Sequence, residues 1–432
     1  MFNAIKFLDK PHIQQSRPGL QRILPLMKAL GNPEQKLQFV HVAGTNGKGS
    51  TCAYLAQIFQ DAGLKTGLFI SPFIFEFNER IQINHKNITP DELNKITYTV
   101  KCAADEIFND SDYPTEFEFY TAIAFLYFAQ KKCDIVVCEV GMGGRLDSTN
   151  IIPAQNKIVS VIAPISVDHT NYLGADIKSI AAEKAGIIME GVPTVSAPQT
   201  NDVASILKGT CAKKHSSLYF VQESDITNSH IVRTTANVAD VEFFRKFNYK
   251  GAEYSTRLIA NYQPINAAVA IEAARIASLQ FSQISPEIIL KSAAQTHWPV
   301  RFELVRKNPV CVVDGSHNVQ GAHNFVQSFL EVFPSKTAIL VVGVLADKQY
   351  KQMVQELCQI TKCAICITPP NERALSANIL AKEFIAAGIC AHAAESFSHA
   401  KSLAFKTYTK NDVICAVGSL YSAAQMYKIL TS

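Results

Sequence analysis

The sequence predicts an α/β protein: a P-loop-containing, mainly parallel sheet domain, followed by a second, smaller Rossmann-like α/β domain. Three observations predict this architecture. Short apolar strands alternate with amphipathic helices along most of the chain. A glycine-rich loop joins an apolar strand to an apolar-faced helix near the N-terminus. The alternation restarts after a proline-containing segment in the last third of the chain.

The first domain is expected at residues 1–297. Its strands are expected at short apolar runs between helical stretches, namely Leu37–Val42, Thr66–Ile70, Ile135–Val140, Ile158–Ala163 and Val192–Ala197. The pattern changes between about Leu218 and Tyr262, where runs such as Leu218–Val221 and Val241–Phe244 predict an antiparallel strand cluster. Two helices are then expected, at Pro264–Ser278 and Pro286–Thr296.

The second domain is expected at residues 298–432. The segment Thr296–Pro299 predicts a linker, because proline lacks an amide donor and disfavours a helical residue before it. Strands separated by helical stretches are expected after it, at Val310–Val313, Ala338–Val342, Ala364–Thr368 and Val413–Val417.

Composition narrows the class of protein. Of the 432 residues, 48% are apolar and 18% charged, which is typical of a globular chain with buried cores. The formal net charge of +4 is spread without a dense Lys/Arg cluster, which favours small anionic ligands over nucleic acid. No apolar stretch is long enough to span a bilayer or to form a signal core. We expect a cytoplasmic monomer with no membrane or nucleic-acid partner.

The cysteines also favour a cytoplasmic protein. The chain has 11 cysteines in apolar contexts, which favours buried thiols in a reducing compartment. Cys363 and Cys366 form a lone CxxC inside a strand-like run. No second pair has metal-site spacing, so we expect core positions rather than a zinc or redox site.

The motif with the most specific chemistry is Gly44–Thr51, which reads GTNGKGST and lies between an apolar strand and a helix. Glycines let backbone amides turn toward phosphate oxygens, and the helix N-terminus adds positive potential. Lys48 can neutralise phosphate charge, and Ser50 or Thr51 can ligate Mg²⁺. A glycine-rich turn with no function would not need this lysine and these hydroxyls.

The loop departs from the common GxxxxGK[ST] pattern. Val42 occupies the first glycine position, and Gly49 stands between Lys48 and Ser50. It is therefore a P-loop variant, which weakens a generic GTPase or ATPase interpretation.

Polar residues stand at the carboxyl ends of several predicted strands. In a parallel sheet these ends line the crevice in which a ligand binds. Glu139 ends one strand before a glycine-rich run, and its carboxylate could hold Mg²⁺ or simply be solvated. Asp314 and His317 follow the strand Val310–Val313. Taken alone, His169 is more typical of a structural histidine, and Lys184 of a solvated helix lysine.

Together these motifs resemble the folylpolyglutamate synthase and dihydrofolate synthase family, relatives of the Mur cell-wall ligases. The resemblance covers nearly the whole chain in the family's order. Its most specific parts are GTNGKGS at 44–50, SP and FNERI between 71 and 81, EVGMGGRLDSTN at 139–150, EKAGII at 183–188 and DGSHN at 314–318. Phe73 departs from a histidine common after Ser-Pro, and Val300 replaces the glycine of a usual Pro-Gly-Arg.

The resemblance implies a role for each matching residue. The positions that match ATP-binding residues are Gly47, Lys48, Gly49, Ser50, Asn266, Arg301 and Asp314. Those that match Mg²⁺ ligands are Ser71, Glu139, His169 and Lys184, the last as a carbamate formed with CO₂. Those that match pteroate contacts are Thr115, Phe117 and Asp147. The catalytic residues expected on this basis are Lys48, Lys184 and His317.

The activity implied by the resemblance is ATP-dependent addition of L-glutamate to folates through an acyl phosphate, and also to dihydropteroate, giving dihydrofolate. The implied small-molecule partners are folate or dihydropteroate, L-glutamate and ATP. The implied cofactors are ATP and Mg²⁺, with K⁺ as a further candidate. Residues 1–297 would be the ATP-binding domain, like the central domain of Mur ligases, and residues 298–432 the glutamate-ligase domain.

Two alternatives stay open. A Mur-type cell-wall ligase shares the P-loop and the carbamylated lysine, but carries an extra domain before the loop, and only 43 residues precede Gly44 here. A non-catalytic, ATP-binding regulator is the alternative from another class. Glutamate-dependent ATP turnover would distinguish a ligase from such a regulator.

Overall fold

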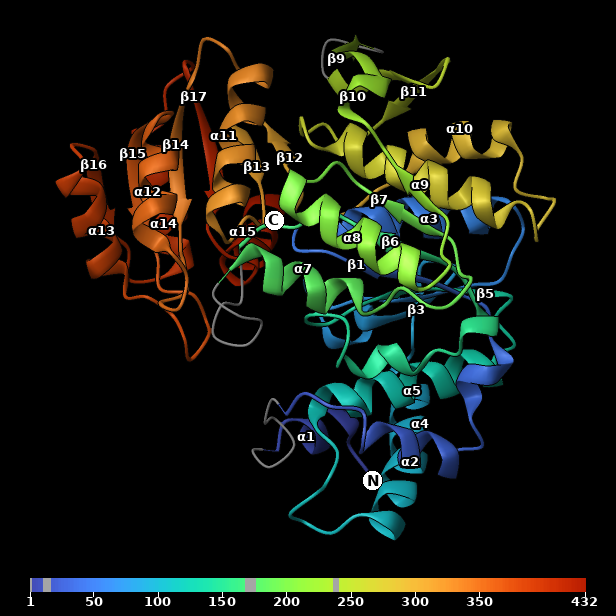
Figure 1. Ribbon diagram of the computed structural model, residues 1–432. Coiled ribbons are helices and arrows are strands. Elements are labelled where there is room, and N and C mark those ends of the chain that lie inside the picture. Colours follow the sequence, from blue (N-terminus) through green and yellow to red (C-terminus); the bar gives the residue numbers. More distant parts are fainter. Residues whose placement is uncertain (1, 11–16, 168–175, 236–240) are drawn as a thin grey trace. The chain divides into compact units, whose positions relative to one another are not determined.

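The computed structural model describes residues 2–10, 17–167, 176–235 and 241–432 (Figure 1). The chain divides into two compact units. The first unit comprises Met1–Thr227, Asn248–Tyr254 and Ile265–Thr296, and the second comprises Asn228–Phe247, Ser255–Pro264 and His297–Ser432. The longest segment of the second unit starts at His297, within the predicted linker. Two shorter segments that precede the linker, Asn228–Phe247 and Ser255–Pro264, also belong to this unit.

The first unit is built on an eight-stranded sheet of order β4-β3-β2-β5-β1-β6-β7-β8. Its strands are β1 (Phe39–Ala43), β2 (Thr66–Phe69), β3 (Ile81–Ile83), β4 (Lys86–Asn87), β5 (Ile135–Glu139), β6 (Lys157–Ile162), β7 (Thr194–Ser196) and β8 (Leu218–Phe220). Pairing is parallel from β2 across to β8, and β3 and β4 add an antiparallel edge. All five strands predicted for this sheet are present.

One strand prediction was wrong. The run Leu218–Val221 was expected in an antiparallel cluster, but β8 pairs in parallel with β7. The intervening helix α8 (Asn201–Lys213) provides the crossover that a parallel pair needs. The rest of that region forms a separate three-stranded sheet of order β11-β10-β9, made of β9 (Ile226–Thr235), β10 (Val241–Tyr249) and β11 (Ala252–Thr256).

Helices cover the sheet of the first unit because its strands are buried and apolar. They are α1 (Ala4–Leu8), α2 (Ile23–Ala29), α3 (Lys48–Asp61), α4 (Pro90–Ile107), α5 (Glu116–Gln130), α7 (Ile177–Ala185), α8, α9 (Gln263–Ala277) and α10 (Pro286–Gln295). Short 3₁₀ helices are η1 (Pro33–Lys36), η2 (Phe77–Arg80), η3 (Ser148–Ile151), η4 (Ala154–Asn156) and η5 (Glu223–Asp225). One core packs α1, α2, α4 and α5 against Phe39, Phe69 and Val136 of the sheet. A second core joins α7 and α8 to Ala43 and Ile162.

The second unit contains a six-stranded sheet of order β12-β13-β17-β14-β15-β16. Its strands are β12 (Glu303–Lys307), β13 (Val310–Val313), β14 (Thr337–Val342), β15 (Thr361–Cys366), β16 (Cys390–Ala393) and β17 (Asp412–Val417). Only β12 runs antiparallel to its neighbour. Its helices are α11 (Val319–Val332), α12 (Tyr350–Cys358), α13 (Ala377–Ala386), α14 (Phe397–Thr407) and α15 (Leu420–Thr431).

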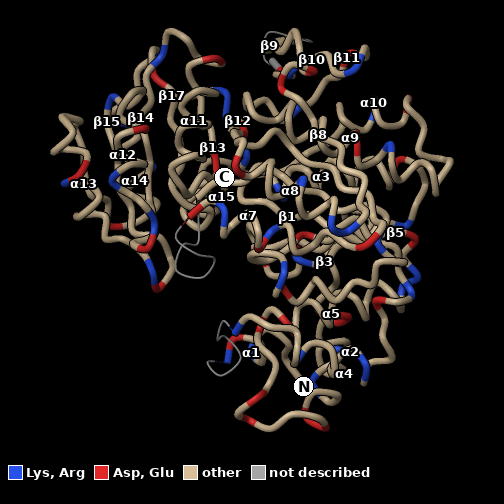
Figure 2. The backbone as a smooth tube through the Cα atoms, in the orientation of Figure 1, with Lys and Arg blue, Asp and Glu red and all other residues tan. Residues whose placement is uncertain are grey.

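The four strands predicted for this unit are confirmed, and the fold class with them. The edge strands β12 and β16 were not predicted, because their residues are mostly half-buried or exposed and form no apolar run. Lys and Arg are interspersed with Asp and Glu along both units (Figure 2). None of the described helices is long and apolar enough to cross a membrane.

Candidate active site

The P-loop is the connection between β1 and α3. Gly47 caps the N-terminus of α3 with a φ of 82°, and no side chain caps the helix there. A Cβ on Gly47 would lie 2.4 Å from Oδ1 of Asn266, so only glycine fits between the loop and α9. The uncapped first turn leaves backbone amides facing a site that suits phosphate oxygens.

The loop is also held from its other side. The amide of Thr45 donates to the carbonyl of Pro164 at 2.9 Å, and its hydroxyl donates to the carbonyl of Ser166 at 3.0 Å. The amide of Ser166 donates back to the Thr45 hydroxyl at 3.1 Å. These bonds fix the loop against the segment that follows β6.

Lys48, Glu139 and Ser71 meet where β1, β5 and β2 end. Glu139 stands opposite Val42 in the parallel register and is buried, with 5% exposure. Its Oε1 lies 3.8 Å from Nζ of Lys48, and its Oε2 accepts the amide of Ser71 at 3.1 Å. Lys48, Glu139 and the backbone of Ser71 are thus brought together beside the P-loop.

Arg80 adds a second cation, whose placement was not predicted. Its Nη1 donates to Oγ of Ser71 at 3.1 Å. The guanidinium lies 5.1 Å from the ring centroid of Phe73, 5.7 Å from that of Phe77 and 4.6 Å from that of Tyr120. Phe73, which departs from the family's usual histidine, therefore forms part of an aromatic cage that fixes this arginine.

Lys184 reaches the P-loop from α7. It is buried, with 4% exposure, and its Nζ donates to the carbonyl of Gly44 at 2.8 Å. The glycine-rich segment after β5 lies against the same helix end, since a Cβ on Gly144 would lie 2.7 Å from the Glu183 carbonyl oxygen. Lys184 is thus not a solvated helix lysine. His169, the fourth predicted Mg²⁺ ligand, lies outside the described residues.

The residues expected to contact pteroate split into two kinds. Thr115 caps the N-terminus of α5. Its hydroxyl donates to the Glu118 carboxylate at 2.8 Å and accepts the Glu118 amide at 3.4 Å, and these bonds stabilise the start of the helix. The ring of Phe117 lies directly over Gly141, where a Cβ would be 2.3 Å from its Cζ. Asp147 accepts the amide of Met142 at 3.0 Å, so Phe117 and Asp147 both border the loop that follows β5.

A buried polar chain supports Asp147, and the sequence did not predict it. Nζ of Lys157 donates to the Ile187 carbonyl at 2.9 Å and lies 3.1 Å from Nδ1 of His41. Nε2 of His41 lies 2.8 Å from Oγ1 of Thr149, which in turn donates to Asp147. Both His41 and Lys157 lie within strands that read as apolar, so no local pattern marked them.

The protonation of this chain follows from its burial. Burial, with the nearby Lys157, lowers the pKa of His41 well below its usual range, so the imidazole is neutral. With Nδ1 accepting from Lys157, Nε2 carries the proton and donates to Thr149. Burial lowers the pKa of Lys157 to about 7 and raises that of Asp147. The donors from Lys157 through His41 and Thr149 therefore lead to Asp147, and Lys157 also donates to the Ile187 carbonyl.

The second unit gathers Arg301, Asp314 and His317 where β13 ends. Asp314 accepts the amides of Phe302 at 2.7 Å and Ser316 at 2.8 Å. A Cβ on Gly315 would lie 2.5 Å from Nη1 of Arg301, so the guanidinium occupies the space over this glycine. Nδ1 of His317 lies 3.1 Å from the Gly315 carbonyl oxygen.

Val300 is the second departure from the family pattern, after Phe73, and its backbone conformation is unusual. Its φ is 59°, a left-handed conformation that is rare for a β-branched residue. A glycine, usual at this position in the family, would adopt it without strain. Val300 thus adopts the conformation before Arg301 at a cost that a glycine would not carry.

Comparisons with known proteins agree with this geometry. The Mur ligase middle domain family matches residues 42–274, and the Mur ligase glutamate ligase domain family matches residues 300–420. A folylpolyglutamate synthase complexed with ADP from Mycobacterium tuberculosis superposes with a TM-score of 0.88 at 28% identity, over 99% of this chain and 97% of that one. The P-loop unit and the second α/β unit thus define a ligase of the Mur class.

Curated relatives narrow the class further. Folylpolyglutamate synthase of Lacticaseibacillus casei is 35% identical over 78% of both chains. Dihydrofolate synthase/folylpolyglutamate synthase of Bacillus subtilis is 37% identical over 79% of both chains. The chain belongs to the folylpolyglutamate synthase and dihydrofolate synthase family.

Proposed function

We propose that this protein is an ATP-dependent amide ligase that adds L-glutamate to folates through an acyl phosphate, and that it also joins glutamate to dihydropteroate. The observation that carries the proposal is the meeting of Lys48, Glu139 and Ser71 beside a P-loop held between two elements. Relatives support it, including E. coli FolC in complex with DHPP and ADP, which has a TM-score of 0.85 at 25% identity and covers 99% of this chain and 97% of that one.

The chemistry asks the protein to position groups and to neutralise charge. A substrate carboxylate attacks the γ-phosphorus of ATP, which gives an acyl phosphate and ADP. The glutamate amine then attacks the acyl carbon, phosphate leaves, and an amide forms. Such a phosphoryl transfer needs alignment and cations rather than a covalent protein nucleophile. Lys48 provides a cation beside the phosphates, and the amides of the first turn of α3 bind their oxygens.

Mg²⁺ fits the residues that the first unit brings together. The carboxylate of Glu139 and the hydroxyl of Ser71 are hard oxygen donors of the kind that Mg²⁺ prefers, and they lie on adjoining strand ends. His169 and carbamylated Lys184 are the further proposed ligands. When bound, the ion would neutralise charge on the transferring phosphoryl group. Phe117 and Asp147 would hold the pterin by stacking and hydrogen bonding.

The remaining assignments are proposals of the same kind. We assign residues 1–297 to ATP binding and 298–432 to the glutamate-ligase domain, which the family matches at 42–274 and 300–420 support. Asn266, Arg301 and Asp314 are proposed ATP contacts, and His317 a proposed catalytic residue. The described cysteines are free thiols, which favours the cytoplasm. A monomeric state and a role for K⁺ remain predictions.

The test is ADP release by the purified protein with tetrahydrofolate or dihydropteroate, each with and without L-glutamate. We expect ADP release only when glutamate and one of the two acceptors are both present. Lys48→Ala should lower this rate on the order of 10²-fold or more, because one cation beside the transferred phosphoryl group is lost. Lys28→Ala, at an exposed lysine of α2, should leave the rate unchanged.

Three results would contradict the proposal. ATP turnover independent of glutamate would indicate the non-catalytic regulator. Glutamate-dependent turnover that needs a nucleotide-linked cell-wall precursor, and that neither folate-type acceptor supports, would indicate a Mur-type ligase. Near wild-type turnover by correctly folded Lys48→Ala would remove the P-loop lysine from the mechanism.

A further inference from the structure

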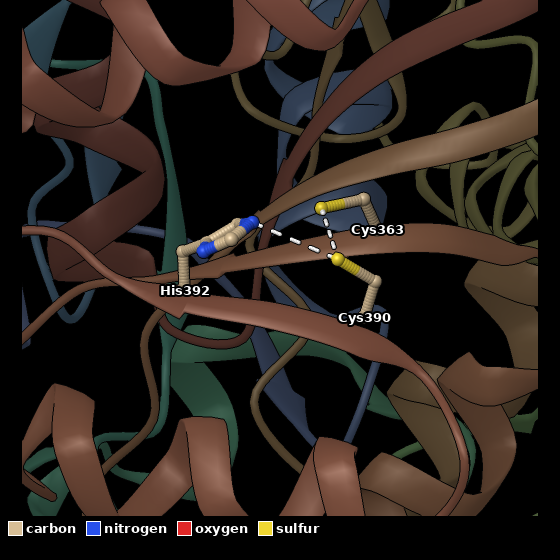
Figure 3. A group of neighbouring side chains, drawn as sticks. All are labelled: Cys363, Cys390 and His392. Atoms are coloured by element: carbon tan, nitrogen blue, oxygen red, sulfur yellow. Dashed lines mark hydrogen bonds between the residues drawn. The ribbon is translucent and has the colours of Figure 1, made fainter.

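The second unit contains a cluster of three metal-ligating side chains outside the candidate active site: Cys363, Cys390 and His392. Cys363 lies on β15, and Cys390 and His392 lie on the neighbouring edge strand β16. Cys363 is directly opposite Cys390 in the parallel register, and His392, two residues further, projects from the same face of the sheet. Figure 3 shows the two thiols and the imidazole pointing toward one another.

Two of the three distances within the cluster match the edges of a tetrahedral zinc site. Sγ of Cys363 lies 3.8 Å from Sγ of Cys390, which lies 3.6 Å from Nε2 of His392. All three ligand atoms lie within 4.8 Å of one another. A tetrahedral Zn²⁺ with bonds of about 2.3 Å to sulfur and about 2.0–2.1 Å to nitrogen separates two sulfurs by about 3.8 Å, and a sulfur and a nitrogen by about 3.5–3.6 Å.

Packing accounts for the buried Cys363 but not for Cys390 and His392. The opposite face of the same strands carries Ala364 and Cys366 into the core, and Ala391 and Ala393 pack against it. Cys390 and His392 are exposed, so they contribute little to the apolar core. The sequence motif CxxC misleads here, because Cys366 lies on the core face and cannot join Cys363. Cys363 instead meets a cysteine 27 residues away.

We propose that Cys363, Cys390 and His392 bind one Zn²⁺ ion that pins the edge strand β16 to β15. Two thiolates and one imidazole suit this borderline-soft cation and not Mg²⁺. Among the described residues the cluster comprises these three ligands, so water completes the tetrahedron. Binding displaces the two thiol protons to solvent. The ion would fasten a four-residue strand that has only one neighbour in its sheet.

The experiment titrates the full protein, freed of metal by a chelator and kept in a non-thiol reductant, with Co²⁺ and then with Zn²⁺. We expect one Co²⁺ per chain, with thiolate-to-cobalt charge-transfer absorption and intense tetrahedral d–d bands, both abolished by stoichiometric Zn²⁺. Cys390→Ser and His392→Ala should each weaken Zn²⁺ binding at least about tenfold, because a ligand is lost. Cys358→Ser removes a half-buried thiol of the same unit and should bind like the wild type.

A second readout addresses stability. Trp298, the one tryptophan of the chain, lies in the second unit and reports its unfolding. Zn²⁺ should raise the melting temperature seen by Trp298 fluorescence in the wild type and in Cys358→Ser, but not in Cys390→Ser. Co²⁺ spectra without charge-transfer absorption, or equal zinc affinity in Cys390→Ser, His392→Ala and the wild type, would overturn the proposal. Both substituted side chains are exposed, so the variants should fold.

Discussion

Two buried lysines of the first unit, Lys184 and Lys157, have different neighbours and are expected to have different chemical roles. Lys184 donates to the P-loop carbonyl of Gly44 at 2.8 Å, next to the expected phosphates. Lys157 donates to the Ile187 carbonyl at 2.9 Å and lies beside His41, within the chain that leads to Asp147. Lys184 thus contacts the P-loop itself, whereas Lys157 belongs to the polar chain that leads to Asp147. Each leads to a different prediction.

Lys184 is predicted to work as a carbamate. An ammonium would repel Mg²⁺, whereas a carbamate offers the oxygen that this ion prefers. We expect Lys184→Ala to lose ligase activity about 10²-fold or more, and a short carboxylate such as acetate to restore part of it. Lys178→Ala, at an exposed position of the same helix, should stay active. Absence of rescue at any carboxylate concentration, with Lys184→Ala still folded, speaks for an unmodified amine.

Lys157 is predicted to make the first unit more stable at high pH. Burial lowers its pKa to about 7, against an ordinary value of 10.5 that the unfolded chain retains. At a pH between these two pKa values, Lys157 is protonated in the unfolded chain and neutral in the folded protein. The free energy of unfolding therefore rises with pH by up to about 1.4 kcal/mol per pH unit, and this rise vanishes below about pH 7.

Urea unfolding of the wild type and of Lys157→Met, followed by far-ultraviolet circular dichroism from pH 7 to 10, tests this sign. The variant should lose the slope, whatever its stability at any single pH. Trp298 fluorescence reports the second unit and serves as the internal control. Parallel pH profiles for the two proteins would refute the prediction.

At the scale of elements, the P-loop depends on one glycine in a tight space. Gly47 and Gly63 have nearly equal φ values of 82° and 80°, but only Gly47 faces a neighbour, whereas a Cβ on Gly63 would meet nothing within 4 Å. Both alanine variants should lose about 1–2 kcal/mol from the left-handed backbone. Only Gly47→Ala should also displace Asn266 and the loop.

We therefore expect Gly47→Ala to raise the KM for ATP by at least tenfold, whereas Gly63→Ala keeps it, as steady-state kinetics can measure. Tenfold corresponds to about 1.4 kcal/mol of lost ATP binding. Equal KM values in the two variants would mean that backbone strain alone, and not the contact with Asn266, limits this position.

The elements also show what the sequence could predict. Buried parallel strands form continuous apolar runs, so the five central strands of the first sheet and four of the second were predictable. The edge strands β12 and β16 were not, because half-exposed strands lack such runs. The orientation of β8 was missed because its partner, β7, is separated from it by a whole helix.

The candidate site was predictable only in part. Glycines, a lysine and strand-end acids marked the P-loop, Glu139 and Asp314. The resemblance to a family, and not the local pattern, pointed to Ser71 and Lys184. His41 and Lys157 lie inside apolar strands, and the cage around Arg80 depends on residues far apart in the chain. Such contacts are set by tertiary packing, which a single sequence does not display.

We expect two activities from this one protein. Dihydropteroate should be a substrate as well as reduced folate. Asp147→Asn should raise the KM for dihydropteroate about tenfold, because the buried chain from Lys157 then ends on a neutral amide. The KM for ATP should not change. Asp202→Asn, at an exposed position of α8, is the control. Product analysis that finds ligation on tetrahydrofolate and none on dihydropteroate would exclude the second activity.

The proposed mechanism requires ATP to activate the carboxylate of the acceptor as an acyl phosphate. The most direct measurement uses an acceptor whose carboxylate carries heavy oxygen, and follows the label by mass spectrometry after ligation. We predict that one labelled oxygen appears in inorganic phosphate for each amide formed, and that labelled phosphate and amide fall together in Lys48→Ala. Amide formation with wholly unlabelled phosphate would contradict the account.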